Sequence, residues 1–310
     1  RSRSMLDNYA GPSAAGLERV NSRVQRRAAG AHSKASAPSS KILLIAGAAL
    51  ILVALVIALF LIYRYTSADQ KNDSFVEAAG LDPQTEVVAD DADPNAISIN
   101  WEALRRINSD VVGWIMIPGT RVNYPIVQTV ENEYYLTHMF DKSVSDSGAI
   151  FLDYEANSKL QGKNNMMYGH NMLDGSMFAA LSKYQDQAFF DSHRTILLFT
   201  PEKNYKLEVV SVLLCEAQDK IRQVNFADDT AYRNYVNLLL GYSVINTIDA
   251  TAPPTGLYSL ATCTGVDNSK RFVVLAKDTG EVVTSSDAAQ PTDGGSDPAA
   301  AQDGAASDQG

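Results

Sequence analysis

The chain has few of the residues that build metal centres and disulfide scaffolds. It contains 2 cysteines and 4 histidines among 310 residues. Two cysteines are too few for a four-cysteine zinc site or a disulfide-rich scaffold. The histidines show neither an HExxH pattern nor another paired-ligand spacing. The sequence therefore indicates no metal site.

Basic residues are also scarce, except at one end. The chain has 26 Lys and Arg against 36 Asp and Glu, for a net charge of −10, which argues against nucleic acid as a partner of the whole chain. Residues 1–41 differ, because eight basic residues face only Asp7 and Glu18 there. We interpret this arm, rich in Ala, Ser, Gly and Arg, as disordered and cytoplasmic. A nucleic-acid-binding arm is the alternative.

One stretch lacks charge altogether. Ile42–Tyr63 is a run of 22 residues without a charged side chain. About 20 apolar residues span a bilayer, so the run predicts a transmembrane helix. A cleaved signal peptide, with an apolar run of roughly 7–15 residues, is the rival interpretation. The basic arm precedes the run, so the positive-inside rule predicts a single-pass protein of the cell membrane, with a cytoplasmic N-terminus and everything later outside.

Composition divides the rest of the chain into three parts. Residues 64–97 are polar and acidic, and predict a solvated stalk with at most a short helix near residues 74–80. Residues 98–283 consist mainly of short apolar segments separated by turns, which predicts a mainly β fold closed, or nearly closed, into a barrel. Residues 284–310 contain five aspartates and no basic residue, and predict a disordered acidic tail.

Three helices are predicted within residues 98–283. Ser176 can cap a short helix that carries Phe178, Leu181 and Tyr184 on one side. Asn100 can cap a helix with apolar positions at Trp101, Leu104 and Ile107. Asp228 or Asp229 begins a longer helix, which carries apolar residues at helical spacing: Tyr232, Tyr235, Val236 and Leu239. We interpret that stripe as core packing.

The residues that suggest chemistry surround two neighbouring strands near the C-terminus. The apolar runs 258–262 and 272–276 flank a polar, turn-forming stretch. Cys263 lies where the first strand ends, and Arg271 where the second begins. A cation beside a thiol can lower the pKa of the thiol or meet an oxyanion. With His170 upstream as a proton carrier, these residues form a complete acyl-transfer set.

Cys263 also has a structural interpretation. Extracytoplasmic proteins with two cysteines often join them, and Cys215 is the only possible partner. Cys215 follows the apolar run Val209–Leu214, as a buried small side chain would. Cys263 lies between threonines at a strand end, which favours a free thiol there.

Taken together, these motifs resemble the sortases. The ordered set is YGHNMLDGSMFAAL, then SLATC, then KRFVVLAK. The upstream stretches DVVGWIMIPGTRVNYPIVQ, ENEYYLTH and GAIFLD resemble the class B branch, and the similarity extends from about Trp101 to Lys277. One departure is Ser259, where the family motif usually begins with threonine.

The resemblance implies a closed eight-stranded β-barrel with N-terminal helices and an inserted helix at Asp228–Tyr242. It implies transpeptidation at a sorting signal of the Asn-Pro-x-Thr type in secreted surface proteins. Cys263 would attack the threonine carbonyl, His170 would carry the proton, and Arg271 would hold the substrate and the oxyanion. The peptide groove would be lined by Asn132, Leu136, Tyr168, Ala261 and Thr262.

The partners implied are surface proteins with a sorting signal and an amine of a cell-wall precursor or a pilin lysine. This chemistry requires no metal and no organic cofactor, because the thioacyl intermediate stores the energy of the cleaved bond. Two alternatives stay open: a membrane-anchored cysteine protease with water as acceptor, and a non-enzymatic β-barrel binding module with a Cys215–Cys263 disulfide.

Overall fold

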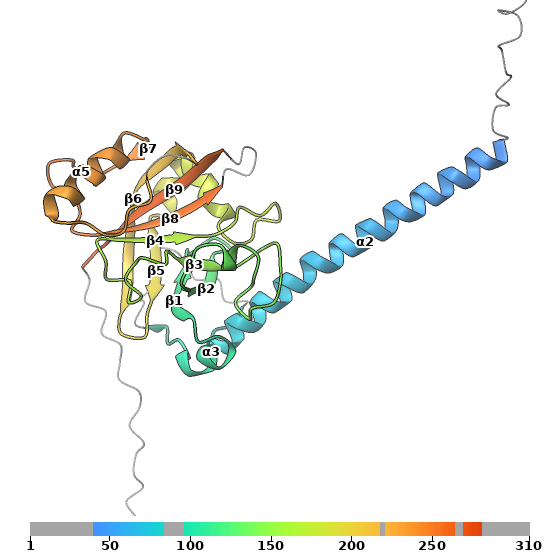
Figure 1. Cartoon of the computed structure of the whole chain (residues 1–310), viewed down its shortest axis with the longest axis horizontal. Helices are drawn as coiled ribbons and strands as arrows, with labels where there is room; N and C mark the ends of the chain where they lie inside the picture. The colour runs from blue at the N-terminus through green and yellow to red at the C-terminus, as the bar shows by residue number, and fades with distance from the viewer. Residues whose placement is uncertain (1–39, 84–95, 218–220, 264–268, 281–310) are drawn as a thin grey trace, which may run out of the picture. The chain divides into compact units, whose positions relative to one another are not determined.

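The computed structural model describes residues 40–83, 96–217, 221–263 and 269–280 (Figure 1). The chain divides into two compact units, residues 1–62 and 63–310. Residues 1–39 of the predicted disordered arm and the tail 284–310 lie outside this description, as does most of the turn between the last two predicted strands. Residues 40 and 41, which the sequence assigns to the disordered arm, instead begin helix α2 (Ser40–Ala78).

Short apolar segments form the strands, as the sequence predicts. Their bounds are β1 (Val111–Met116), β2 (Asn123–Val127), β3 (Ile150–Leu152), β4 (Asn164–Tyr168), β5 (Thr195–Phe199), β6 (Asn204–Glu216), β7 (Ser243–Asn246), β8 (Leu257–Cys263) and β9 (Lys270–Asp278). The last strand therefore ends at Asp278 rather than near Val283.

Eight of these strands close into a barrel. They follow the order β5-β1-β2-β3-β4-β8-β9-β6, and β6 pairs back onto β5. The 13-residue strand β6 is long enough to pair with β5 through residues 204–208 and with the additional strand β7 through residues 211–213. The mainly β fold with a closed eight-stranded barrel is thus confirmed.

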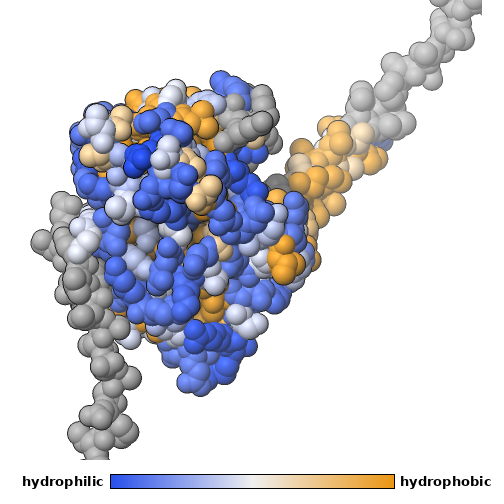
Figure 2. All heavy atoms as spheres, turned by 60° about the vertical axis from the view of Figure 1, so that its left-hand side comes forward, coloured by the Kyte–Doolittle hydropathy of each residue, from blue (hydrophilic) through white to orange (hydrophobic). Residues whose placement is uncertain are grey.

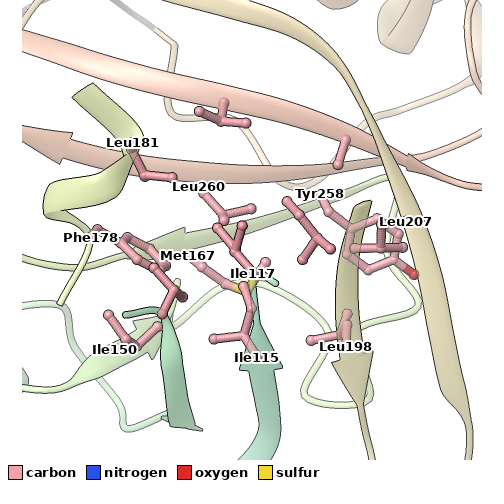
Figure 3. Packing of buried hydrophobic residues seen from close by; sticks show 14 of the residues in the cluster. Ile115, Ile117, Ile150, Met167, Phe178, Leu181, Leu198, Leu207, Tyr258 and Leu260 are labelled. Carbon is pink, nitrogen blue, oxygen red and sulfur yellow. The ribbon is translucent and has the colours of Figure 1, made fainter. Parts of the chain in front are cut away.

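The barrel interior is filled by side chains rather than by a channel. Ile115 of β1, Met167 of β4 and Leu260 of β8 are fully buried and point toward one another (Figure 3). Burying a side chain of this size stabilises the folded state by roughly 1.5–3 kcal/mol. Packing of this kind fixes the ends of the strands rigidly, which matters for any residue placed there.

Helices cover the outside of the barrel. They are α3 (Trp101–Ile107), α4 (Gln187–Ser192), α5 (Asp229–Leu240) and the 3₁₀ segments η2 (Tyr134–Leu136) and η3 (Ala179–Gln185). Asn100 Oδ1 accepts from Ala103 N at 3.0 Å, and Asp228 Oδ1 accepts from Ala231 N at 2.8 Å. The caps predicted at Asn100 and Asp228 are confirmed. The cap predicted at Ser176 is wrong, because η3 begins at Ala179 and its N-cap residue Phe178 makes no side-chain hydrogen bond.

The predicted apolar stripe of α5 packs in the core, as expected. Tyr232, Tyr235, Val236 and Leu239 are buried against residues of β6, β8 and β9. The inserted helix therefore covers the outer face of these three strands.

The predicted stalk is wrong at its beginning. Helix α2 (Ser40–Ala78) does not end with the apolar run but continues through the polar residues that follow it. Phe75, Val76 and Ala79 are buried in a cluster with Trp114 and Phe199. This short apolar face anchors the end of α2 to the barrel wall, so residues 64–78 form helix and not a solvated, irregular linker.

The apolar part of α2 exposes its side chains, which form an orange surface in Figure 2. Leu44 is 73% exposed and Ile62 is 58% exposed. Within the described ranges, however, no helix combines the length and hydropathy needed to cross a membrane. The transmembrane helix predicted at Ile42–Tyr63 is therefore not confirmed.

Candidate active site

The candidate site lies where three adjacent strands end at one rim of the barrel (Figure 1). Strand β4 pairs in parallel with β8, with Tyr168 opposite Ala261. His170 and Cys263 each follow two residues later, so both lie at the same level. Strand β8 pairs antiparallel with β9, with Cys263 opposite Arg271. The backbone thus brings together the three residues predicted to be catalytic. The side chain of Cys263 lies outside the structural description.

His170 is fixed by a contact with the η2 segment. Its Nε2 lies 2.7 Å from the carbonyl oxygen of Leu136. A carbonyl can only accept, so Nε2 carries the proton in this arrangement. Gly169 brings the chain close to the core, since a Cβ there would overlap Ile150 Cδ1 and lie 2.8 Å from Phe178 Cδ2. Only glycine fits at this position without rearrangement, and it places His170 at the rim.

Arg271 lies between the two cysteines of the chain. Strand β9 separates β6 from β8, with Cys215 opposite Arg271 on one side and Cys263 on the other. The Arg271 Nη1 group donates to Lys270 O at 2.9 Å.

The same register excludes a disulfide. Two strand spacings place the Cα atoms of Cys215 and Cys263 roughly 10 Å apart, beyond the limit of about 7 Å for a disulfide. Cys215 carries a thiol, is 4% exposed and donates from Sγ to Arg271 O over 3.8 Å. The alternative of a Cys215–Cys263 disulfide is therefore wrong.

A groove of about 350 Å³ adjoins these strand ends. It contains all five residues predicted to bind substrate, together with His170 and Arg271. Its lining is Asn132, Glu133, Leu136, Phe151, Met166, Tyr168, Gly169, His170, Ala217, Ile221, Arg222, Ala261, Thr262 and Arg271. Two further cavities, of about 250 and 380 Å³, contain none of the predicted residues.

Thr262 has an unusual place in the groove. The residue is 2% exposed, and its Oγ1 is buried without a hydrogen-bond partner. A buried hydroxyl without a partner costs about 1–3 kcal/mol, so such groups are few in native structures. Because Thr262 lines the groove, a bound molecule could supply the missing partner.

The groove floor carries a perturbed phenol. Burial raises the pKa of Tyr168, and the nearby negative charge of Asp153 raises it further. The Tyr168 OH donates to Asp153 Oδ2 at 2.9 Å, so the phenol stays protonated at physiological pH.

No metal centre is evident among the described residues, where no three His, Cys, Asp or Glu side chains converge. The absence of a cofactor stays a prediction from the sequence.

Sequence reasoning missed several groove residues. Ile221 and Arg222 come from the segment between β6 and α5, and Asp153, directly after β3, lies beneath the lining. Asp153 had one readable signal, a carboxylate immediately after the apolar strand of GAIFLD. Arg222 had none, because its acidic partner is 69 residues away in the chain.

Comparisons with known proteins agree with this geometry. A model of the sortase domain matches residues 115–279. Sortase B of Listeria monocytogenes is 34% identical over 176 residues, covering 56% of this chain and 72% of the relative. Sortase B of Staphylococcus aureus is 32% identical over 179 residues, covering 57% and 73%.

Solved structures give the same answer. A sortase B complex from Bacillus anthracis is 31% identical with a TM-score of 0.58, covering 69% of this chain and 96% of that one. A Staphylococcus aureus sortase B–substrate complex is 32% identical with a TM-score of 0.52, covering 57% and 83%. Matches of sequence and of barrel thus coincide over the segment that contains the candidate site. The chain therefore belongs to the sortase family of cysteine transpeptidases, in its class B branch.

Proposed function

We propose that this enzyme cleaves a sorting signal of the Asn-Pro-x-Thr type and joins the threonine carboxyl group to an amine. The observation that carries the proposal is the convergence of His170, Cys263 and Arg271 on three adjacent strand ends beside one groove. A nucleophile, a proton carrier and a charge partner at one rim are what acyl transfer requires.

The reaction proceeds in two halves. The Cys263 thiolate attacks the threonine carbonyl carbon, and Arg271 stabilises the oxyanion that forms. The C–N bond breaks, His170 gives a proton to the leaving amine, and a thioester remains. An incoming amine then attacks the thioester, His170 accepts its proton, and the new amide leaves with the thiolate regenerated.

The groove provides the binding surface for the peptide. Asn132, Leu136, Tyr168, Ala261 and Thr262 contact the sorting signal in this proposal. Support comes from the similarity to the Staphylococcus aureus sortase B–substrate complex. A sortase B structure complexed with triglycine supports an amine as the acceptor, which here is an amine of a cell-wall precursor or a pilin lysine.

The location is part of the proposal. We place the catalytic domain outside the cell, attached to the membrane of a Gram-positive bacterium through residues 42–63, with a cytoplasmic N-terminus. The support is the uncharged run, which is preceded by eight basic residues between Arg1 and Lys41. Protease added to intact cells should remove the acidic tail and spare the N-terminal arm, and a protected tail would contradict this orientation.

Product analysis separates a transpeptidase from the alternative cysteine protease. The enzyme is incubated with a library of sorting peptides, with and without an added amine such as triglycine. We expect an acyl-enzyme with Asn-Pro-x-Thr peptides and an amide product only when the amine is present. The same hydrolysed peptide under both conditions would indicate a protease, and no acyl-enzyme with any peptide would refute the proposed function.

A further inference from the structure

Asp153 is a fully buried carboxylate that no step of the proposed reaction uses. It directly follows β3, and its side chain has 0% exposure. Five donors converge on it. Its Oδ2 accepts from Arg222 Nε at 2.7 Å, Tyr168 OH at 2.9 Å and Asn132 Nδ2 at 3.1 Å. Its Oδ1 accepts from Arg222 Nη2 at 2.8 Å and Glu155 N at 3.0 Å.

The three side-chain donors all line the peptide groove. They come from separate parts of the chain: Asn132 precedes η2, Tyr168 ends β4, and Arg222 lies between β6 and α5. One buried carboxylate beneath the groove therefore links three parts of its lining.

Several contacts fix the orientation of the Arg222 side chain. It forms a two-bond fork with Asp153, bonds Glu155 Oε2 at 2.7 Å through Nη2, and places its guanidinium 5.0 Å from the ring centre of Tyr154. Hydrogen bonding to Asp153 raises the pKa of Arg222, so it is always charged. A bidentate pair fixes angle as well as distance.

The main chain around Arg222 is anchored by other contacts. The Ile221 carbonyl accepts from Tyr235 OH at 2.6 Å, and the Gln223 carbonyl accepts from Asn164 Nδ2 at 2.9 Å. Asp153 is therefore not needed to hold this segment on the barrel. Its specific effect is on the side chain of Arg222 and on the groove-facing groups that share the carboxylate.

Stability alone does not account for such a site. Asp153 is fully buried while the Arg222 side chain is 40% exposed, and burying the carboxylate costs desolvation energy that such a pair often fails to recover. The pair instead fixes geometry. The two hydrogen bonds from Arg222 and the hydrogen bond from the Tyr168 hydroxyl to Asp153 exclude other rotamers of these side chains.

We propose that Asp153 is a positioning residue that sets the shape of the peptide groove through Arg222, Tyr168 and Asn132, a role that rests on the proposed function. It touches no reacting atom. It affects the reaction through the position that the sorting peptide takes relative to the strand ends.

The test uses substitutions that are milder than removing the buried charge. Arg222→Lys keeps the charge but loses the fork, and Tyr168→Phe keeps the ring but loses the bond to Asp153. The matched control is Arg194→Lys, which alters a second Arg–carboxylate pair, with Glu208, on residues that do not line the groove. Melting temperature, peptide acylation kinetics and iodoacetamide alkylation of Cys263 are measured for each protein.

We expect Arg222→Lys to raise KM for the sorting peptide about tenfold while kcat and the alkylation rate change by less than about twofold. The control should keep the wild-type KM. Both substitutions act through one carboxylate. The factor by which the double variant Tyr168→Phe/Arg222→Lys raises KM should therefore be smaller than the product of the factors for the two single variants.

Three results would overturn the proposal. A purely structural role would lower the active fraction, and therefore kcat, with KM unchanged. Equal changes in Arg222→Lys and Arg194→Lys would show that the groove pair is not special. Absence of wild-type acylation with every sorting peptide would refute the proposed function itself, and the positioning role with it.

Discussion

The two sides of strand β9 carry the same chemical group in different surroundings. Cys215 lies on β6 and Cys263 on β8, and each is opposite Arg271 of β9. Cys215 is followed by Glu216, which pairs with Lys270, and it packs in the cluster beneath α5. Cys263 ends its strand, directly after two residues that line the groove.

Position in the sheet, and not residue type, therefore determines the role of each cysteine. A thiol reacts as a thiolate and requires access to its partner. Cys215 is 4% exposed within an apolar cluster, so a substrate cannot reach it. Arg271 lies opposite both cysteines, so substitutions at these positions and around them test whether the two sides of β9 differ in role.

The largest effect is expected at the reactive side. Cys263→Ala should abolish formation of the acyl-enzyme, because no other groove residue can form the thioester. His170→Ala should reduce it almost as far, since proton transfer to the leaving amine is lost. Mass spectrometry of enzyme mixed with sorting peptide measures both, and a persistent acyl-enzyme in Cys263→Ala would contradict the assignment.

The next effect concerns the residue between the cysteines. Arg271→Lys keeps the charge but loses the planar set of donors, so peptide acylation should fall roughly 10²–10³-fold, as for loss of an oxyanion donor. Arg271→Ala should lose more. Alkylation by iodoacetamide builds no oxyanion and should change much less. Equal losses in both rates would show that arginine acts only on the pKa of the thiol.

A smaller effect, of opposite sign for stability and activity, is expected at Thr262. Thr262→Val removes a buried hydroxyl that has no partner, so the free energy of unfolding should rise by about 1 kcal/mol. If the hydroxyl bonds the sorting peptide, acylation should fall about tenfold at the same time. Thermal unfolding and acylation kinetics on one preparation test this, and unchanged activity would remove Thr262 from the binding surface.

The smallest effect on activity is expected at the buried side. Cys215→Ala removes a sulfur from the cluster beneath α5 and should lower the free energy of unfolding by about 1 kcal/mol, with acylation unchanged. Chemical denaturation provides the measurement. A folded but inactive Cys215→Ala would mean that the two sides of β9 are not as different as the register indicates.

Local patterns predicted the barrel and the rim of the site. Turn residues bounded the short apolar strands, and the caps at Asn100 and Asp228 set the starts of two helices. Cys263 and Arg271 could be placed at facing strand ends because only a short loop separates them in the chain.

Non-local contacts outside the family motifs could not be predicted. The Asp153–Arg222 pair joins residues 69 positions apart, and its geometry depends on how β3 meets the segment before α5. The end of α2 was missed for a related reason, because Phe75 and Val76 are few apolar residues in a polar stretch and become a buried face only against the barrel.

The most direct test is to locate the thioester. Wild-type enzyme is trapped with a sorting peptide at low pH, digested, and the acylated fragment is sequenced by mass spectrometry. The proposed arrangement predicts the threonine acyl group on the fragment with Cys263 and an unmodified thiol at Cys215. An acyl group on Cys215, or a digest in which the two cysteines are joined, would contradict it.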